Sequence, residues 1–338
     1  MDYRRRLADR EEVATQEMAQ AYTVAMVPVV NRLKRITAQI EEMKANGEEP
    51  DAIMLMVQSQ LQQNLLTLRE GLKEWKDKSV VAVSDGQRDS AMLANTQKQV
   101  VDLIQGTPPP GVVVAWNPIN EEAIQALVGY SGDGSPLADL FDSVVSAQEN
   151  GIRDSLIAGT AAGLGPEALA EVMYARVADP TNLPMTRARV IARTEMMRAS
   201  RAANQMLFAD NPGIIGYRRM VIQDSRACIA CIGLSGTFHK VGDIMPTHPQ
   251  CRCSQVPVTR SFAELVGDKT IPDHNPPPLT GEMIMSGLTE ADHRAILGDV
   301  RYEQWKNGTK LDKFFTIENN PDWGPTTRIK PIWDTQSR

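Results

Sequence analysis

The sequence predicts an α+β protein that is mainly α-helical, and three observations lead to this prediction. Long stretches of the first half carry apolar residues at the alternating three- and four-residue spacing of packed helices. A segment that begins near residue 214 alternates in the manner of a strand. All four cysteines follow it, between residues 228 and 253, where their sulfurs can meet at one metal ion. We therefore expect an N-terminal helical hairpin, a helical middle region, a small metal-stapled β unit and a short helical C-terminal tail.

The composition is that of an ordinary soluble protein. The 338 residues are 42% hydrophobic and 23% charged, and the formal net charge is −6. The chain as a whole is therefore not a polycation built to coat nucleic acid, and any DNA contact must come from a local patch. The N-terminus lacks the apolar region of a secretory signal, and the longest apolar run, 21–30, is too short to span a bilayer. We expect a protein made in the cytoplasm.

The N-terminal hairpin is predicted from two apolar seams. The first seam lies in a helix from about residue 10 to residue 46 and consists of Tyr22, Met26, Val29, Leu33, Ile36, Ile40 and Met43. The second consists of Met54, Leu61, Leu65, Leu68, Leu72 and Trp75. Residues 47–50 have the composition of a turn, so the two helices should pack against each other as an antiparallel pair. The same helices are candidates for self-association. A third, weaker helix is expected at 86–105.

Two proline-rich segments, 107–111 and 272–278, predict the domain boundaries. They divide the chain into an N-terminal helical arm (1–106), a central domain with the Cys/His site (112–260) and a small C-terminal helical module (279–338).

Within the central domain, Thr186 is expected to cap a helix that runs from Arg187 to about Phe208. Strands are expected at 214–222 and 254–258, with a small hairpin of its own at 236–242.

The cysteine block predicts a structural zinc site. Five donors are available for four tetrahedral positions: Cys228, Cys231, His248, Cys251 and Cys253. The spacing does not show which of the five is left out. Two disulfides are an alternative, but a cytoplasmic protein keeps its thiols reduced.

A redox Cys-x-x-Cys is another alternative, usually found at the start of a helix. Here Gly233 and Gly236 favour a turn after the pair. A zinc deaminase would need His-x-Glu ahead of Pro-Cys-x-x-Cys, which this chain lacks. Asp224 and Asp243 are the only acids near the cluster, and neither is placed as a general base. We therefore expect no enzymatic activity.

The segment 187–226 is locally basic within an acidic chain. Its arginines are Arg187, Arg189, Arg193, Arg198, Arg201, Arg218, Arg219 and Arg226, and its acids are Glu195, Asp210 and Asp224. On a helix, Arg187, Arg198 and Arg201 share about one face, which makes them candidates for weak, non-specific contact with DNA. The alternative is that these arginines form ion pairs inside the domain.

These motifs resemble a known family. The resemblance covers about residues 115–258 and is carried by Arg189-Val-Ile-Ala-Arg-Thr-Glu195, Asn204, Asp224-Ser-Arg-Ala-Cys-Ile-Ala-Cys231, Leu234, Gly236 and Thr247-His-Pro-Gln-Cys-Arg-Cys253. These residues are similar to the head morphogenesis (minor head) proteins of tailed phages, typified by protein F of phage Mu. The resemblance implies a virion component of the phage head, present in few copies near the portal vertex. Its implied partners are the portal protein and other head proteins, with DNA as a further candidate in packaging or delivery.

Two other classes of protein remain open from the residues alone. A nucleic-acid-processing enzyme can carry a zinc ribbon beside its cleft, and a DNA-binding regulator can carry a basic helix. Some relatives also end in a toxin domain, but the roughly eighty residues after the cysteine block contain no catalytic constellation.

Overall fold

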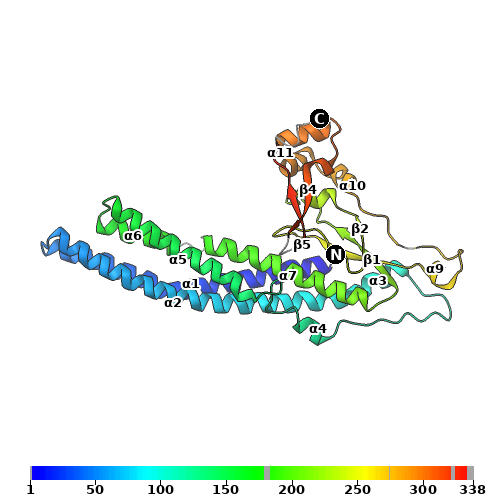
Figure 1. Ribbon diagram of the computed structural model, residues 1–338, viewed down its shortest axis with the longest axis horizontal. Coiled ribbons are helices and arrows are strands. Elements are labelled where there is room, and N and C mark those ends of the chain that lie inside the picture. The colour runs from blue at the N-terminus through cyan, green and yellow to red at the C-terminus, as the bar shows by residue number, and fades with distance from the viewer. Residues whose placement is uncertain (1, 179–182, 274, 321–323, 333–338) are drawn as a thin grey trace. The chain divides into compact units, whose positions relative to one another are not determined.

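The computed structural model describes residues 2–178, 183–273, 275–320 and 324–332, and it confirms a mainly helical α+β protein. The chain forms two compact units, each built from separated segments (Figure 1). Unit 1 consists of residues 1–7, 87–128 and 193–338; unit 2 consists of 8–86 and 129–192. No described helix is both long and apolar enough to cross a membrane.

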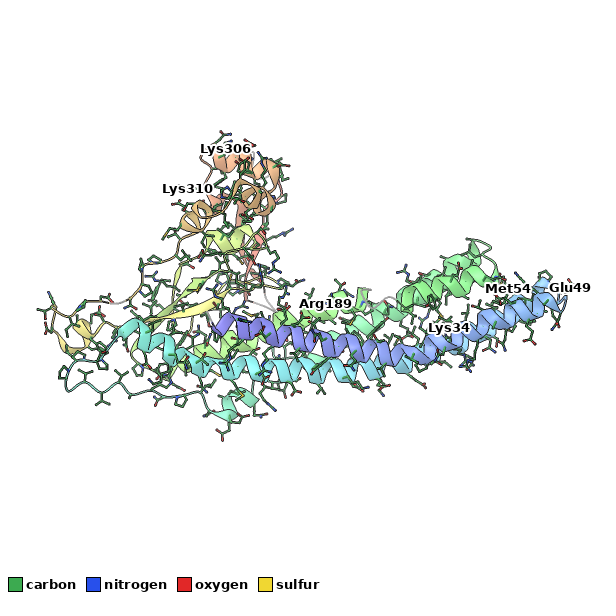
Figure 2. The ribbon with its side chains drawn as sticks, turned by 180° about the vertical axis from the view of Figure 1, so that it is seen from behind. Lys34, Glu49, Met54, Arg189, Lys306 and Lys310 are labelled. Atoms are coloured by element: carbon green, nitrogen blue, oxygen red, sulfur yellow. The ribbon has the colours of Figure 1, made fainter. Side chains whose placement is uncertain are left out.

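Most of the predicted antiparallel hairpin lies in unit 2. Helices α1 (Asp2–Ala45) and α2 (Pro50–Met92) lie side by side and are joined by a turn that contains Glu49 (Figure 2). The backbones approach closely at Gly71, where a Cβ would stand 2.6 Å from the carbonyl oxygen of Ala25. The first predicted seam is buried from Tyr22 to Ile40.

The core of unit 2 is centred on a fully buried Trp75. Its Nε1 donates a hydrogen bond of 3.0 Å to the carbonyl oxygen of Met18. Its ring meets Tyr22 and Phe141 edge-on, with centroid distances of 5.6 and 6.1 Å. Phe141 lies on α5 (Leu137–Ala161), which is followed by α6 (Pro166–Val177). Aromatic edges and aliphatic side chains therefore fill the space between these helices.

The third predicted helix differs from the expectation. Helix α2 continues without a break to Met92, a 3₁₀ turn η1 (Leu93–Thr96) follows, and α3 covers only Gln97–Gln105. The short helix α4 (Glu121–Gln125) begins at the N-cap Asn120, whose side chain accepts a hydrogen bond from the backbone of Ala123. The long helix α7 (Leu183–Ala209) begins before Thr186, so the predicted cap lies inside the helix.

The sheet of unit 1 has the order β2-β1-β3 and is antiparallel throughout. Strand β1 is Ile214–Met220, β2 is Phe238–Lys240 and β3 is Ser254–Thr259. The strand predicted at 254–258 is present as β3, and it pairs with β1. The predicted hairpin at 236–242 is wrong, because its one strand, β2, pairs with β1 instead.

The C-terminal part of unit 1 contains a hairpin that was not predicted. The described elements of this C-terminal part are α9 (Phe262–Val266), α10 (Gly281–Ser286), α11 (Glu290–Lys306), η2 (Leu311–Phe314), β4 (Phe315–Asn320) and β5 (Gly324–Ile329). Helix α11 begins with a capping box between Thr289 and Asp292. The helix is interrupted after Leu297, where Gly298 has φ 72° and ψ 159°. Strands β4 and β5 pair antiparallel, so this module is not purely helical.

The predicted domain boundaries at 107–111 and 272–278 concern which segments fold alone, and they stay predictions.

Candidate metal centre

The first pair of donors is held by a short helix directly after β1. Helix α8 (Ile229–Gly233) has Cys228 as its N-cap, and the Cys228 sulfur accepts a hydrogen bond of 3.3 Å from the backbone N–H of Cys231. The turn predicted from Gly233 and Gly236 is thus replaced by one helical turn that starts at the first cysteine. The N-cap position fixes the Cys228 sulfur beside that of Cys231.

The second group of donors lies on the loop that precedes β3. The Cys228 Sγ–His248 Nε2 distance is 3.1 Å, Cys231 Sγ–His248 Nε2 is 3.2 Å, and Cys231 Sγ–Cys251 Sγ is 3.7 Å. Cys228, Cys231 and His248 form one trio of donor atoms within 4.8 Å of one another, and Cys231, Cys251 and Cys253 form another. All five predicted donors are therefore brought together, with Cys231 common to both trios.

The ring of His248 is oriented for metal binding. Its Nδ1 lies 2.7 Å from the carbonyl oxygen of Pro249, so this nitrogen carries the proton and donates it. The lone pair of Nε2 then faces the sulfurs of Cys228 and Cys231. Metal-binding histidines usually donate their second N–H to a carboxylate or a backbone carbonyl in this way.

The spacing suits a metal ion better than a disulfide. Zinc–sulfur bonds of about 2.3 Å place two sulfurs of a tetrahedral site about 3.8 Å apart. The Cys231–Cys251 distance of 3.7 Å agrees with that separation and far exceeds a disulfide bond of about 2.05 Å. All four cysteines are free thiols. The Cys/His cluster can therefore bind a metal.

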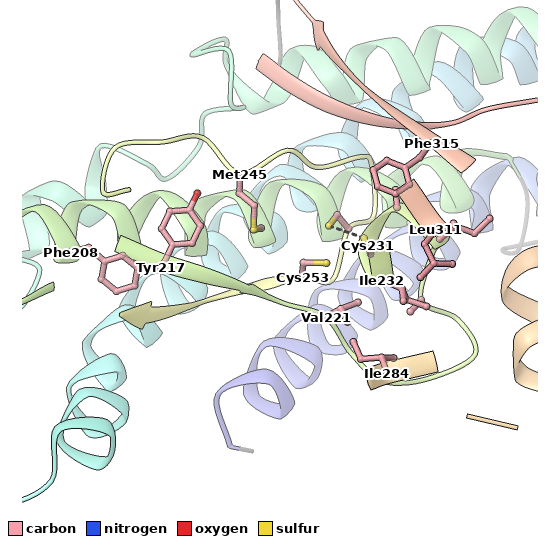
Figure 3. Packing of buried hydrophobic residues seen from close by; sticks show 14 of the residues in the cluster. Phe208, Tyr217, Val221, Cys231, Ile232, Met245, Cys253, Ile284, Leu311 and Phe315 are labelled. Carbon is pink, nitrogen blue, oxygen red and sulfur yellow. Dashed lines mark hydrogen bonds between the residues drawn. The ribbon is translucent and has the colours of Figure 1, made fainter. Parts of the chain in front are cut away.

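The cluster belongs to the core of unit 1 (Figure 3). Cys231, Cys251 and Cys253 are buried, among side chains that include Met245 and Phe315. Cys228 and His248 are partly exposed and border a cavity of about 40 Å³. The cluster is thus enclosed by protein except at one edge, through which a metal ion can reach the donors.

The C-terminal hairpin braces the loop from outside. The backbone N–H of Thr247 donates a hydrogen bond of 3.2 Å to the carbonyl oxygen of Pro325. The backbone N–H of Thr327 donates one of 2.8 Å to the carbonyl oxygen of Thr247. The residue before His248 is therefore fixed by strand β5. Nothing in the sequence indicated this contact, because the hairpin was not predicted.

Side chains of helix α7 hold the same loop through hydrogen bonds to its backbone. Arg201 donates to the carbonyl oxygen of Cys251 at 2.7 Å and to that of Cys253 at 3.0 and 3.1 Å. The Thr194 hydroxyl accepts 3.1 Å from the backbone of Gln250, which has a left-handed φ of 63°. Arg201 was a candidate for DNA contact; in the structure its guanidinium holds the cysteine loop, and DNA contact by this residue stays a prediction.

The other two candidate DNA contacts differ from each other. Arg198 is half-buried and forms an ion pair of 3.4 Å with the buried Glu195. Arg187 is exposed, as is Arg189 on the same helix (Figure 2). The alternative of internal ion pairs therefore applies to Arg198, whereas DNA contact by any of the three stays a prediction.

One arginine that the sequence did not single out contacts the sulfurs directly. Arg219, on β1, is 1% exposed and donates to Cys231 Sγ at 3.3 Å and to Cys251 Sγ at 3.7 Å. It also donates to the carbonyl oxygen of Pro246. Burial works to lower the pKa of Arg219, but the charges of Cys253, Cys231 and Cys251 outweigh it and raise that pKa.

The partly exposed Cys228 is an acidic thiol. Its contact with Cys231 and its hydrogen bond with His248 lower the pKa of Cys228 to about 4, against the opposing effect of burial. Burial also opposes protonation of His248, yet the hydrogen bond with Cys228 and the nearby sulfur charges raise the pKa of that imidazole. Cys228 thus favours the thiolate form that a metal ligand requires, whereas contacts with Cys228, Cys251 and Cys253 raise the pKa of the Cys231 thiol.

The two acids near the cluster make structural contacts. Arg252 donates to both carboxylate oxygens of Asp224 at 2.9 and 2.7 Å, and this pairing holds the pKa of Asp224 below its usual value. Arg226 forms a second ion pair with Asp224 at 3.3 Å. The carboxylate of Asp243 accepts 2.8 Å from the backbone of Lys240.

Comparison with known proteins identifies one family. Residues 150–256, just under a third of the chain, match the family described as Phage Mu protein F like protein. The match includes α7, β1 and the whole cysteine block, so the resemblance predicted from these motifs is confirmed over this segment. No match was found among curated proteins or among solved structures.

Proposed function

We propose that this chain is a structural minor head protein of a tailed phage, which acts near the portal in head assembly and in DNA packaging or delivery. The observation that carries the proposal is the family match over 150–256, because it coincides with the segment that forms the cysteine site and its supporting helix. The proposed partners are the portal protein and other head proteins. The proposed location is the phage head, after synthesis in the host cytoplasm.

The proposal is tested on particles of the phage that encodes the chain. Mass spectrometry of purified heads should detect the chain in few copies per particle. A nonsense mutation in its gene should give particles that lack it and a lower yield of infectious phage, restored by the gene in trans. A chain that stays in the lysate and never copurifies with heads would contradict the proposal.

We also propose that the cluster holds one structural Zn²⁺ through His248 and three of the four cysteines, with Cys231 among them. Zinc bound there would tie α8 to the loop 247–253. Metal analysis of the purified chain should find about one zinc per molecule. Cys231→Ser should abolish stoichiometric zinc and lower the free energy of unfolding by several kcal/mol, on the order of a lost structural metal. Absence of zinc together with four oxidised cysteines would favour disulfides instead.

We propose further that the chain has no nuclease activity. The supporting observation is that Asp224 is held by two arginines and Asp243 by a backbone N–H, so both acids have structural roles. Incubation with DNA or RNA and Mg²⁺, Mn²⁺ or Zn²⁺ should give no cleavage. Cleavage that disappears in Asp224→Asn or Asp243→Asn would instead favour a nucleic-acid-processing enzyme.

A further inference from the structure

Arg219 is a charged side chain enclosed in the core of unit 1. It lies on β1, the middle strand of the sheet, and is 1% exposed. One guanidinium nitrogen donates to the sulfurs of Cys231 and Cys251, and the other terminal nitrogen donates to the carbonyl oxygen of Pro246. Among the described residues no carboxylate forms an ion pair with it. Among the residues that the structure describes, its candidate anionic partners are therefore the cysteine sulfurs.

Burying a guanidinium without a counter-charge is strongly unfavourable. An arginine in this position therefore requires a negatively charged partner, and cysteines that bind a metal carry that charge. We propose that Arg219 is the counter-charge of the metal centre, a positioning residue that stabilises the metal-bound cysteines through charge. The inference rests on the zinc site proposed above.

The charge of Arg219 can neutralise a centre of three thiolates, one histidine and one Zn²⁺. Three thiolates and one Zn²⁺ leave the centre with one negative charge, since the imidazole of His248 binds in its neutral form. The guanidinium of Arg219 brings that sum to zero.

The same sum gives the direction of the effect on metal binding. Zinc binds cysteine in its thiolate form, so metal binding fixes negative charge on the sulfurs. A fixed positive charge at 3.3 Å from Cys231 Sγ favours that change. Removing the charge should therefore weaken metal binding even where the sheet still folds.

The neighbouring Arg218 provides a matched control. It lies on the same strand, and its side chain leaves the opposite face of the sheet. It donates 3.1 Å to the carbonyl oxygen of Gly236 and stands 5.9 Å from the centroid of the Phe238 ring. Its replacement removes an arginine from β1 without touching the cysteines.

The experiment compares the full-length chain with Arg219→Met, Arg219→Lys and Arg218→Met. Co²⁺ is titrated into the metal-free proteins and followed by its thiolate charge-transfer absorbance, and Zn²⁺ affinity is measured by competition with a chromophoric chelator. Circular dichroism checks the fold of each variant.

Arg219→Met should weaken the Kd for both metals about 10- to 100-fold, as outer-shell changes typically do. Arg219→Lys should stay within about fivefold of wild type because it keeps the charge, and Arg218→Met should match wild type. A folded Arg219→Met with wild-type Kd overturns the inference, and so does an Arg219→Lys as weak as Arg219→Met. If Arg219→Met does not fold, Arg219→Lys alone decides. A metal Kd within about fivefold of wild type supports the inference, and a Kd weakened beyond that overturns it. A wild-type chain that binds neither metal would instead overturn the zinc site itself.

Discussion

Replacing Arg201 separates a structural role from a role in DNA contact. In the structure its guanidinium makes three donor contacts, at 2.7, 3.0 and 3.1 Å, to the carbonyl oxygens of Cys251 and Cys253. A hydrogen bond from a charged group contributes about 1.5–3 kcal/mol, and two acceptors lose their donor in Arg201→Ala. Because the side chain is half-buried and water can reach part of the site, we expect a loss of about 2–4 kcal/mol in the free energy of unfolding.

The assay is urea unfolding followed by circular dichroism, combined with binding of duplex DNA across a salt series. Arg201→Lys can serve one carbonyl and should recover part of the stability. Arg187→Ala is the matched control, because its exposed side chain should change stability by less than about 0.5 kcal/mol. If the exposed arginines contact DNA, Arg187→Ala should reduce the slope of log binding constant against log salt concentration by about 0.9 in magnitude. An Arg201→Ala with wild-type stability and a shallower salt slope would refute the structural role.

Three further predictions concern other parts of the chain. Trp75→Phe keeps an aromatic ring but removes the donor to Met18, so it should cost about 1–2 kcal/mol in urea unfolding, and an unchanged midpoint would contradict this. Because Arg252 lowers the pKa of Asp224, that ion pair stabilises the fold above the unfolded pKa of about 3.9, and its contribution is lost as the pH falls through the folded value. In thermal melts, the loss of stability caused by Asp224→Asn should therefore become smaller at acid pH. A loss of stability that does not change with pH would exclude the mechanism. Limited proteolysis should cut first within 107–111, which is mostly exposed and carries no helix or strand, and early cuts inside α1 or α2 would show the boundary to be misplaced.

Periodicity alone predicted the helical hairpin, because a buried seam repeats along the chain and is visible without tertiary information. The prediction was less accurate at the start of α2, where Ile53 and Val57 are buried and Met54 is only partly so. The apolar residues there occupy adjacent positions, so the pattern does not fix the phase of the helix. Continuity from α2 toward α3 was missed because polar residues such as Asp85 and Gln87 interrupt the seam.

The cysteine donors were predictable because their residue type is rare and their spacing is specific. The residues that hold them were not. Arg201 and Arg219 were counted as parts of a basic segment, since an arginine in a sequence gives no sign of whether it meets solvent, a carbonyl or a sulfur. The C-terminal hairpin carried only a weak alternation around Ile317, and its bond to Thr247 joins residues far apart in the chain.

The order of synthesis has a consequence for unit 1. The Tyr3 hydroxyl lies 2.6 Å from the Ser200 hydroxyl and accepts 3.2 Å from Asn204, and Leu7 packs with Leu93 and Met197. Tyr3 and Ser200 are 197 positions apart, so at about 5–20 residues per second the ribosome needs about 10–40 s to supply the partner. Throughout that interval the first residues of α1 lack the side chains of α7 that they contact in the folded protein. Unit 1 thus closes only late in translation, from segments made at widely separated times.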